Sequence, residues 1–109
     1  MIETKGLVQI FDQEIASETV FHDMAEIFKA LGDPTRLTIL ALLSTGEKCV
    51  NELADNLEVS QSGVSHQLRI LRSMDIVRYR KEGREVFYSL ADEHVQDILF
   101  RTVEHILHE

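Results

Sequence analysis

The sequence predicts a mainly α-helical chain with one small β-hairpin. Apolar residues recur with the 3.6-residue period of an amphipathic helix along most of the chain. Residues 76–90 instead contain strand-forming β-branched and aromatic residues on both sides of a glycine-containing turn. With 109 residues, of which 44% are hydrophobic, the chain is long enough for a single domain built on one core.

The first part of the chain is predicted to contain an N-terminal arm and two helices. Residues 1–16 can form a short amphipathic helix, which we expect to pack on a partner or on the last helix. A second helix is expected over Val20–Leu31, with Ser17 or Thr19 as its N-cap. Residues 33–34 then begin the most apolar helix, because aspartate caps a helix and proline is tolerated at its first position. We expect this helix to be the central helix of the core.

Residues 49–74 predict a helix-turn-helix, two short helices joined by a turn of three or four residues. The first helix is expected over Cys49–Leu57, and the second is expected to turn Val64, Leu68, Ile70 and Leu71 inward. Its outward side chains suit DNA, because glutamine and arginine make paired hydrogen bonds to adenine and guanine and serine contacts bases or phosphates. The alternative interpretation is that these polar side chains only face solvent and bind nothing. The candidate DNA-binding residues of this helix are Gln61, Ser62, Ser65, His66 and Arg69.

Residues 76–90 follow as a basic β-hairpin, with its turn expected at residues 81–84. A basic hairpin directly after such a helix is a wing, and its cations would reach flanking phosphates or the minor groove. The predicted architecture is therefore a winged helix-turn-helix. The candidate DNA-binding residues of the wing are Arg78, Arg80, Lys81 and Arg84.

The charge is distributed unevenly along the chain. The net charge of −8 argues against nucleic acid, whose phosphates require lysine and arginine. Residues 61–84, however, hold six basic and two acidic residues, a balance of +4 that leaves −12 for the remainder. An acidic body with one basic strip suits a protein that docks on DNA in one orientation and also releases it.

Residues 91–108 form the predicted last helix, with two potential metal ligands at each end. Asp92 and His94 lie at its start, His105 and His108 at its end, and nitrogen and oxygen ligands suit Zn²⁺ and tolerate Co²⁺. Eleven residues separate the inner histidines by about 16 Å, whereas two ligand atoms of one zinc ion are about 3.4 Å apart. Two antiparallel copies could complete the shell, because a two-fold axis brings opposite ends together.

An apolar seam between these ends is the proposed dimer contact. It consists of Val95, Ile98, Leu99, Thr102, Val103 and Ile106. The alternative is structural: aspartate is a common N-cap, and histidines are favoured near helix C-termini by the helix dipole. A zinc hydrolase is disfavoured, since it needs three protein ligands and an open position for water, so we expect no enzyme.

The chain resembles the metal-sensing winged-helix repressors of the ArsR/SmtB family, in the stretches IFKALGDPTRLTILALL, NELADNLEVSQSGVSHQLRILR and VRYRKEGREVFYSL. The resemblance implies a homodimer that holds an operator shut, releases it on binding Zn²⁺ or Co²⁺, and controls metal efflux or homeostasis genes. It implies that Asp92 and His94 of one protomer and His105 and His108 of the other are the ligands. It also implies a hydrogen bond from a ligand histidine toward the end of the recognition helix, near Asp75.

The sequence departs from the family's other common site, a Cys-Val-Cys pattern with further N-terminal thiols. Cys49 and Val50 are present, but Asn51 replaces the second cysteine and the chain has no other. A thiolate site for soft metals is therefore not expected. A residual site of Cys49, Glu52 and His22 remains an alternative, as does a repressor that responds to a thiol oxidant or a protein partner.

The predicted location is the cytoplasm. A single cysteine excludes an internal disulfide framework and fits a reducing compartment. The sequence shows no signal-peptide pattern and no apolar run of membrane-spanning length.

Overall fold

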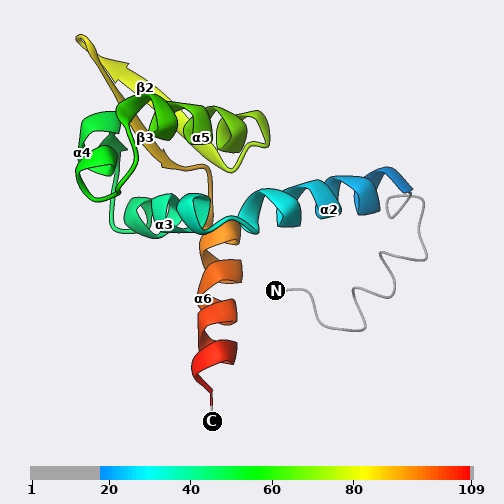
Figure 1. The fold of residues 1–109 in the computed structure, drawn as a ribbon. Helices are drawn as coiled ribbons and strands as arrows, with labels where there is room; N and C mark the ends of the chain where they lie inside the picture. The colour runs from blue at the N-terminus through cyan, green and yellow to red at the C-terminus, as the bar shows by residue number, and fades with distance from the viewer. Residues whose placement is uncertain (1–17, 109) are drawn as a thin grey trace. The chain divides into compact units, whose positions relative to one another are not determined.

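The structure is a computed structural model that describes residues 18–108, with the element order shown in Figure 1. The predicted arm helix over residues 1–16 and the candidate cap Ser17 lie outside the described residues. The chain divides into two units, residues 1–31 and 32–109, and each is described by itself.

Helix α2 of the first unit spans Glu18–Leu31. It begins two residues earlier than predicted, so Thr19 lies inside the helix and is not its cap. Glu18 in the first turn suits the positive end of the helix dipole, which accounts for the earlier start. Phe21 and Phe28 are exposed.

Helix α3 spans Pro34–Leu43 and begins as predicted. The Asp33 carboxylate accepts a hydrogen bond of 3.0 Å from the backbone N–H of Arg36, which satisfies one donor of the first turn. Ile39 and Leu40 are fully buried. The predicted central core helix is confirmed by this burial.

Helices α4, Val50–Asp55, and α5, Gln61–Ser73, form the helix-turn-helix. Three parts of the prediction were wrong: Cys49 and Leu57 lie outside the first helix, and the connection covers residues 56–60 rather than three or four. Cys49 is instead the end of a short strand, because its backbone pairs with Phe87. Propensity alone does not reveal such a long-range pairing.

Helix α5 is fixed at both ends. The Ser60 hydroxyl caps it by accepting a hydrogen bond of 3.1 Å from Gly63 N–H. At its C-terminus, Asp75 adopts the left-handed conformation with φ 58°, and its N–H bonds to Arg72 O. The N–H of Ile76 bonds to Leu71 O, which completes a Schellman motif with aspartate in the position that glycine usually occupies.

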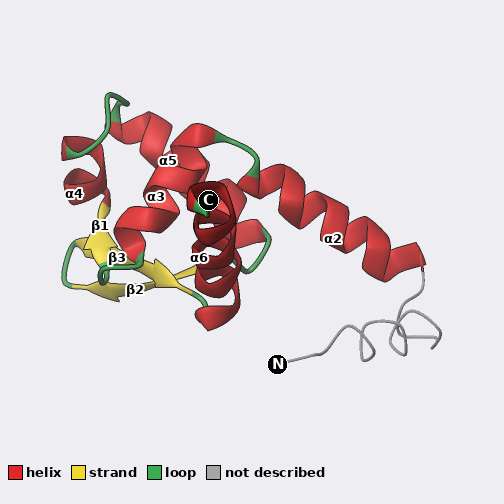
Figure 2. Cartoon of the chain, turned by 90° about the horizontal axis from the view of Figure 1, so that it is seen from below, coloured by secondary structure: helices red, strands yellow, loops and turns green. Residues whose placement is uncertain are grey.

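The sheet contains three antiparallel strands in the order β1-β3-β2. Strand β1 spans Lys48–Cys49, β2 Val77–Glu82 and β3 Glu85–Leu90, and these appear as the yellow arrows of Figure 2. The hairpin is confirmed, but its turn is tighter than predicted: only residues 83–84 lie between the strands, with Gly83 at φ 63°. Strand β1 was not predicted.

The core of residues 32–108 lies between α3, α4, α5 and the start of the hairpin. All of its buried residues are hydrophobic. The largest fully buried side chains are Ile39, Leu40, Leu53, Val64, Leu68, Leu71, Ile76 and Val77.

Helix α6 spans Glu93–Leu107 and begins two residues later than predicted, because Asp92 is its N-cap. It extends away from α3 in Figure 1, and none of its residues is buried. Ile106 and Leu107 are 71% and 72% exposed. Between residues 18 and 108, no helix combines the length and the apolar character that crossing a membrane requires.

Candidate functional site

The outer face of α5 is the first candidate surface. Gln61, Ser62, His66 and Arg69 are exposed, and Ser65 is half-buried. Of the four residues predicted to face inward, Val64, Leu68 and Leu71 are fully buried, whereas Ile70 is only half-buried. Helical geometry therefore turns the polar set away from the core. The face is therefore free to meet a ligand along the first turns of the helix.

A polar contact between α3 and α5 was not predicted. Arg36 Nη1 donates a hydrogen bond of 3.0 Å to Gln67 Oε1. The two residues are 31 positions apart in the chain, so no sequence pattern connects them. This contact fixes α5 against α3 on its polar side.

The wing contacts the end of α5 through an arginine and a tyrosine. The guanidinium of Arg72 lies 4.7 Å from the centre of the Tyr79 ring, a cation–π contact. Tyr79 in turn lies opposite Tyr88, with ring centres 6.0 Å apart. The face of the hairpin that carries these tyrosines is therefore the one turned toward α5.

The four predicted wing cations have different surroundings. Arg78, Lys81 and Arg84 are exposed, with no ion pair among the described residues. Arg80 donates through Nε and Nη2 to Glu47 and through Nη1 to Glu82. The hydrogen bonds to Arg80 lower the pKa of Glu47, and those from Glu47 and then Glu82 raise the pKa of Arg80.

Asp92 and His94 lie together at the start of α6. Asp92 Oδ1 accepts a hydrogen bond of 2.8 Å from His94 N–H, so Asp92 is the N-cap that the structural alternative proposed. His94 Nδ1 lies 3.3 Å from the same oxygen, and its side chain is 86% exposed. Capping uses Oδ1 for one hydrogen bond and leaves Oδ2 without a described partner.

His105 and His108 lie at the other end of the same helix. His105 is in the last turn, His108 is the C-cap, and both are exposed. Fifteen residues of continuous helix separate Asp92 from His108. Within the described residues of one chain, no three histidine, cysteine, aspartate or glutamate side chains come close enough to hold one metal ion.

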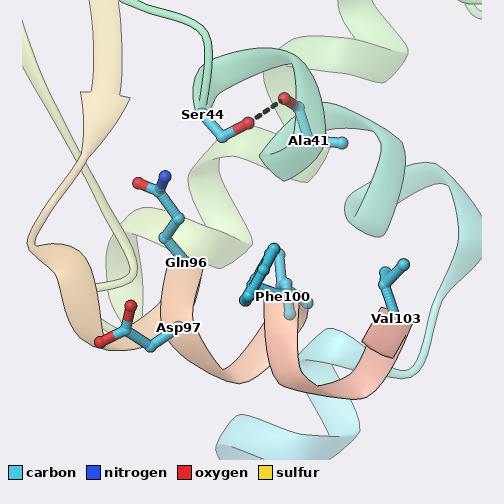
Figure 3. A pocket seen from close by; sticks show the side chains of 7 residues that line it. Ala41, Ser44, Gln96, Asp97, Phe100 and Val103 are labelled. Atoms are coloured by element: carbon cyan, nitrogen blue, oxygen red, sulfur yellow. Dashed lines mark hydrogen bonds between the residues drawn. The ribbon is translucent and has the colours of Figure 1, made fainter. Parts of the chain in front are cut away.

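A mostly apolar groove lies between α3 and α6. On one side it has a volume of about 350 Å³ and on the other about 310 Å³. Figure 3 shows the second side, where Phe100 projects from α6 toward Ala41 of α3. The first side is lined by Leu37, Thr38, Ala41, Leu99, Thr102, Val103 and Ile106.

Cys49 and Glu52 form a local helix cap. Glu52 Oε1 accepts a hydrogen bond of 3.1 Å from Cys49 N–H, and this bond is the largest cause of a lowered pKa at Glu52. The third residue of the alternative site, His22, lies on α2 in the other unit.

Comparison with protein families gives a match over residues 33–79 to the model described as bacterial regulatory protein, arsR family. This range covers the helix-turn-helix and the start of the wing.

Two curated relatives are similar over most of the chain. A transcriptional repressor SmtB homologue from Synechocystis is 48% identical over 93 residues, covering 85% of this chain and 70% of the relative. A cadmium resistance transcriptional regulatory protein CadC homologue from Staphylococcus aureus is 46% identical over 84 residues, covering 76% and 69%.

Solved structures agree with the fold. A homodimeric winged helix-turn-helix DNA-binding domain from Mycobacterium bovis matches with a TM-score of 0.78 and 30% identity, covering 89% of this chain and 94% of that one. The solution structure of apo-NmtR matches with a TM-score of 0.73 and 38% identity, covering 85% and 78%.

Proposed function

The chain belongs to the arsR family of bacterial regulatory proteins, and on that premise we propose that it is a homodimeric repressor that releases operator DNA when Zn²⁺ or Co²⁺ binds. It is a transcriptional regulator and not an enzyme. The genes proposed to be under its control serve metal efflux or homeostasis. The main support is α6, which has two exposed potential ligands at each end and no buried residue between them.

The DNA-binding step uses the outer face of α5. A recognition helix enters the major groove with its N-terminal residues against base edges. In α5 these are Gln61, Ser62 and Ser65, while Arg69 lies one turn further along. The Arg72–Tyr79 contact holds the wing beside this helix, so that exposed wing cations can meet the flanking backbone.

The dimer is proposed to form through α6. Val103, Ile106 and Leu107 are 51%, 71% and 72% exposed, and such an apolar face on a small domain favours association with another surface. A matching solved structure is a homodimer, which supports a second copy as the partner. An antiparallel pair of α6 helices brings the start of one beside the end of the other.

The residues at the ends of α6 fit a metal ion. The 3.3 Å between Asp92 Oδ1 and His94 Nδ1 is close to the roughly 3.4 Å between two ligand atoms of one tetrahedral zinc ion. His105 and His108 supply two further imidazoles at the surface. When bound, the ion would link the two protomers through these side chains.

Release from DNA follows from the geometry of the dimer. The angle at which two α6 helices cross sets the separation of the two α5 helices, which must match half-sites about 34 Å apart. Because the ligand residues come from both protomers, this crossing angle depends on whether the metal is bound. A ligand shifts such an equilibrium only by its differential affinity, so the metal-bound arrangement must fit DNA less well.

The test is a titration of the dimer against a DNA duplex selected from a random-sequence library, with and without Zn²⁺. We expect Zn²⁺ to weaken binding at least tenfold, a coupling of about 1.4 kcal/mol. The same titration with Co²⁺ and with peroxide compares metal release with oxidation of Cys49. An affinity that is unchanged by both Zn²⁺ and Co²⁺ would contradict the sensor proposal.

Two variants separate metal binding from folding. His105→Ala should bind the duplex normally and lose the zinc response. Asp92→Asn should do the same, because asparagine caps a helix as well as aspartate but lacks the carboxylate. A zinc response that persists in both variants would show that other residues bind the metal.

A further inference from the structure

We propose that Arg80 positions the wing and does not bind a DNA phosphate. This inference rests on the proposed operator binding and assigns different roles to cations that the sequence grouped together. The arrangement that supports it is the Arg80 clamp, defined as Arg80, Glu47, Glu82 and Phe87.

The guanidinium of Arg80 is used by neighbours within the chain. Nε lies 2.9 Å from each carboxylate oxygen of Glu47, and Nη1 lies 2.7 Å from Glu82 Oε2. Its central carbon lies 4.9 Å from the centre of the Phe87 ring. Three sides of the planar group are therefore occupied, and two carboxylates outweigh its single positive charge.

The clamp spans the whole sheet. Arg80 of β2 is the register partner of Phe87 of β3, and Phe87 is the register partner of Cys49 of β1. Glu47 lies just before β1. The side chain of Arg80 thus crosses the middle strand and ties the outer strand of the wing to the segment that leads into α4. Because β1 pairs through only two residues, this tie adds to a weak edge.

Strand alternation places Arg80 on the side of the hairpin away from α5. Successive side chains of a strand point to opposite faces, and cross-strand partners share a face. Tyr79 contacts Arg72 of α5, so Lys81 shares the face turned toward α5 and Arg80 lies on the opposite one. Lys81 is the natural matched control, as it is adjacent, exposed and of equal charge.

The experiment measures the affinity for a labelled mixed-sequence DNA duplex, about three helical turns long, as a function of salt concentration. Each phosphate contact contributes roughly 0.9 to the slope of log affinity against log salt. Lys81→Gln should therefore reduce this slope by about 0.9, while Arg80→Gln should leave it unchanged.

Glu47→Gln distinguishes positioning from simple electrostatics. Removing a negative charge near DNA should strengthen binding if charge alone matters. Loss of the clamp should instead weaken binding roughly threefold or more at every salt concentration, and the double variant with Arg80→Gln should be no weaker than either single variant. The charge-reversed pair Glu47→Arg with Arg80→Glu should recover part of the affinity that either reversal alone loses. General damage to the fold by the two substitutions would not give such a recovery.

Two results would overturn the inference: a reduced salt slope for Arg80→Gln, or tighter binding by Glu47→Gln. Failure of the wild-type protein to bind any duplex would instead overturn the proposed function. In that case the amide hydrogen exchange of β2 decides the inference. Faster exchange in both Glu47→Gln and Arg80→Gln supports the clamp, and unchanged exchange rejects it.

Discussion

Helices α5 and α6 are both amphipathic, but only α5 buries its apolar face within the described chain. Leu68 and Leu71 of α5 are fully buried, whereas Ile106 and Leu107 of α6 are 71% and 72% exposed. A helical hydrophobic period therefore shows that a helix has a partner surface without showing whether that surface belongs to the same chain. In a regulator this difference is useful, because α5 is fixed by its own fold while α6 depends on what it meets.

The largest effect is expected for a cavity in the face that α5 buries. Leu68→Ala should lower the free energy of unfolding by about 2–5 kcal/mol, because Leu68 is fully buried among core residues. The exposed Ile106→Ala is the matched truncation on α6, and at protein concentrations too low for dimers it should change stability little. Urea unfolding measures both. Equal losses at low concentration would mean that α6 is packed within its own chain.

The second effect concerns the close approach of α5 to the turn before it. A Cβ added at Gly63 would lie 2.5 Å from Val59 Cγ1, too close for any real contact. Gly63→Ala should therefore destabilise the chain by about 1–3 kcal/mol, although alanine is the better helix former. The double variant with Val59→Ala should recover most of the loss in thermal unfolding. A stable single variant would show that Val59 can move aside at little cost.

The third prediction tests the open face of α6. Ile106→Lys should weaken dimerisation at least tenfold, about 1.4 kcal/mol, because it buries a charge in an apolar contact. The control is Glu104→Lys, two residues away and thus about 200° around the helix. Sedimentation equilibrium gives both dissociation constants. A dimer that tolerates Ile106→Lys would place the contact elsewhere.

The sequence predicted those elements whose signals are local. The start of α3 could be predicted because an aspartate side chain accepts a hydrogen bond from one of the first backbone N–H groups, and because proline has no N–H group that needs a partner. The structure has this aspartate cap. The buried face of α5 and the hairpin could be predicted because hydrophobic residues repeat about every 3.6 positions in a helix and every 2 positions in a strand. Boundaries were less accurate: Leu57 belongs to the turn and not to α4.

What the sequence missed depends on contacts between distant residues. Strand β1 is only two residues long and exists because Lys48 and Cys49 meet β3. Glu47 and Arg80 are 33 positions apart, so nothing local indicates that one neutralises the other. The four candidate ligands of α6 could be named from their types and spacing, but whether they meet depends on a second chain, and their assignment remains a prediction.

The smallest effect contrasts the C-terminal ends of the two helices. Asp75 holds a left-handed conformation at the end of α5, which costs an L-residue about 1–2 kcal/mol and aspartate somewhat less. Asp75→Gly should remove that cost, but glycine also gives the unfolded chain more conformational freedom, which favours unfolding. The free energy of unfolding should therefore rise by about 0.5 kcal/mol. His108 at the end of α6 has φ −70°, so His108→Gly should bring no gain. Chemical unfolding monitored by circular dichroism can resolve the pair. A destabilised Asp75→Gly would show that the aspartate side chain contributes more to this turn than its backbone costs, and that both ends of α5 depend on side chains.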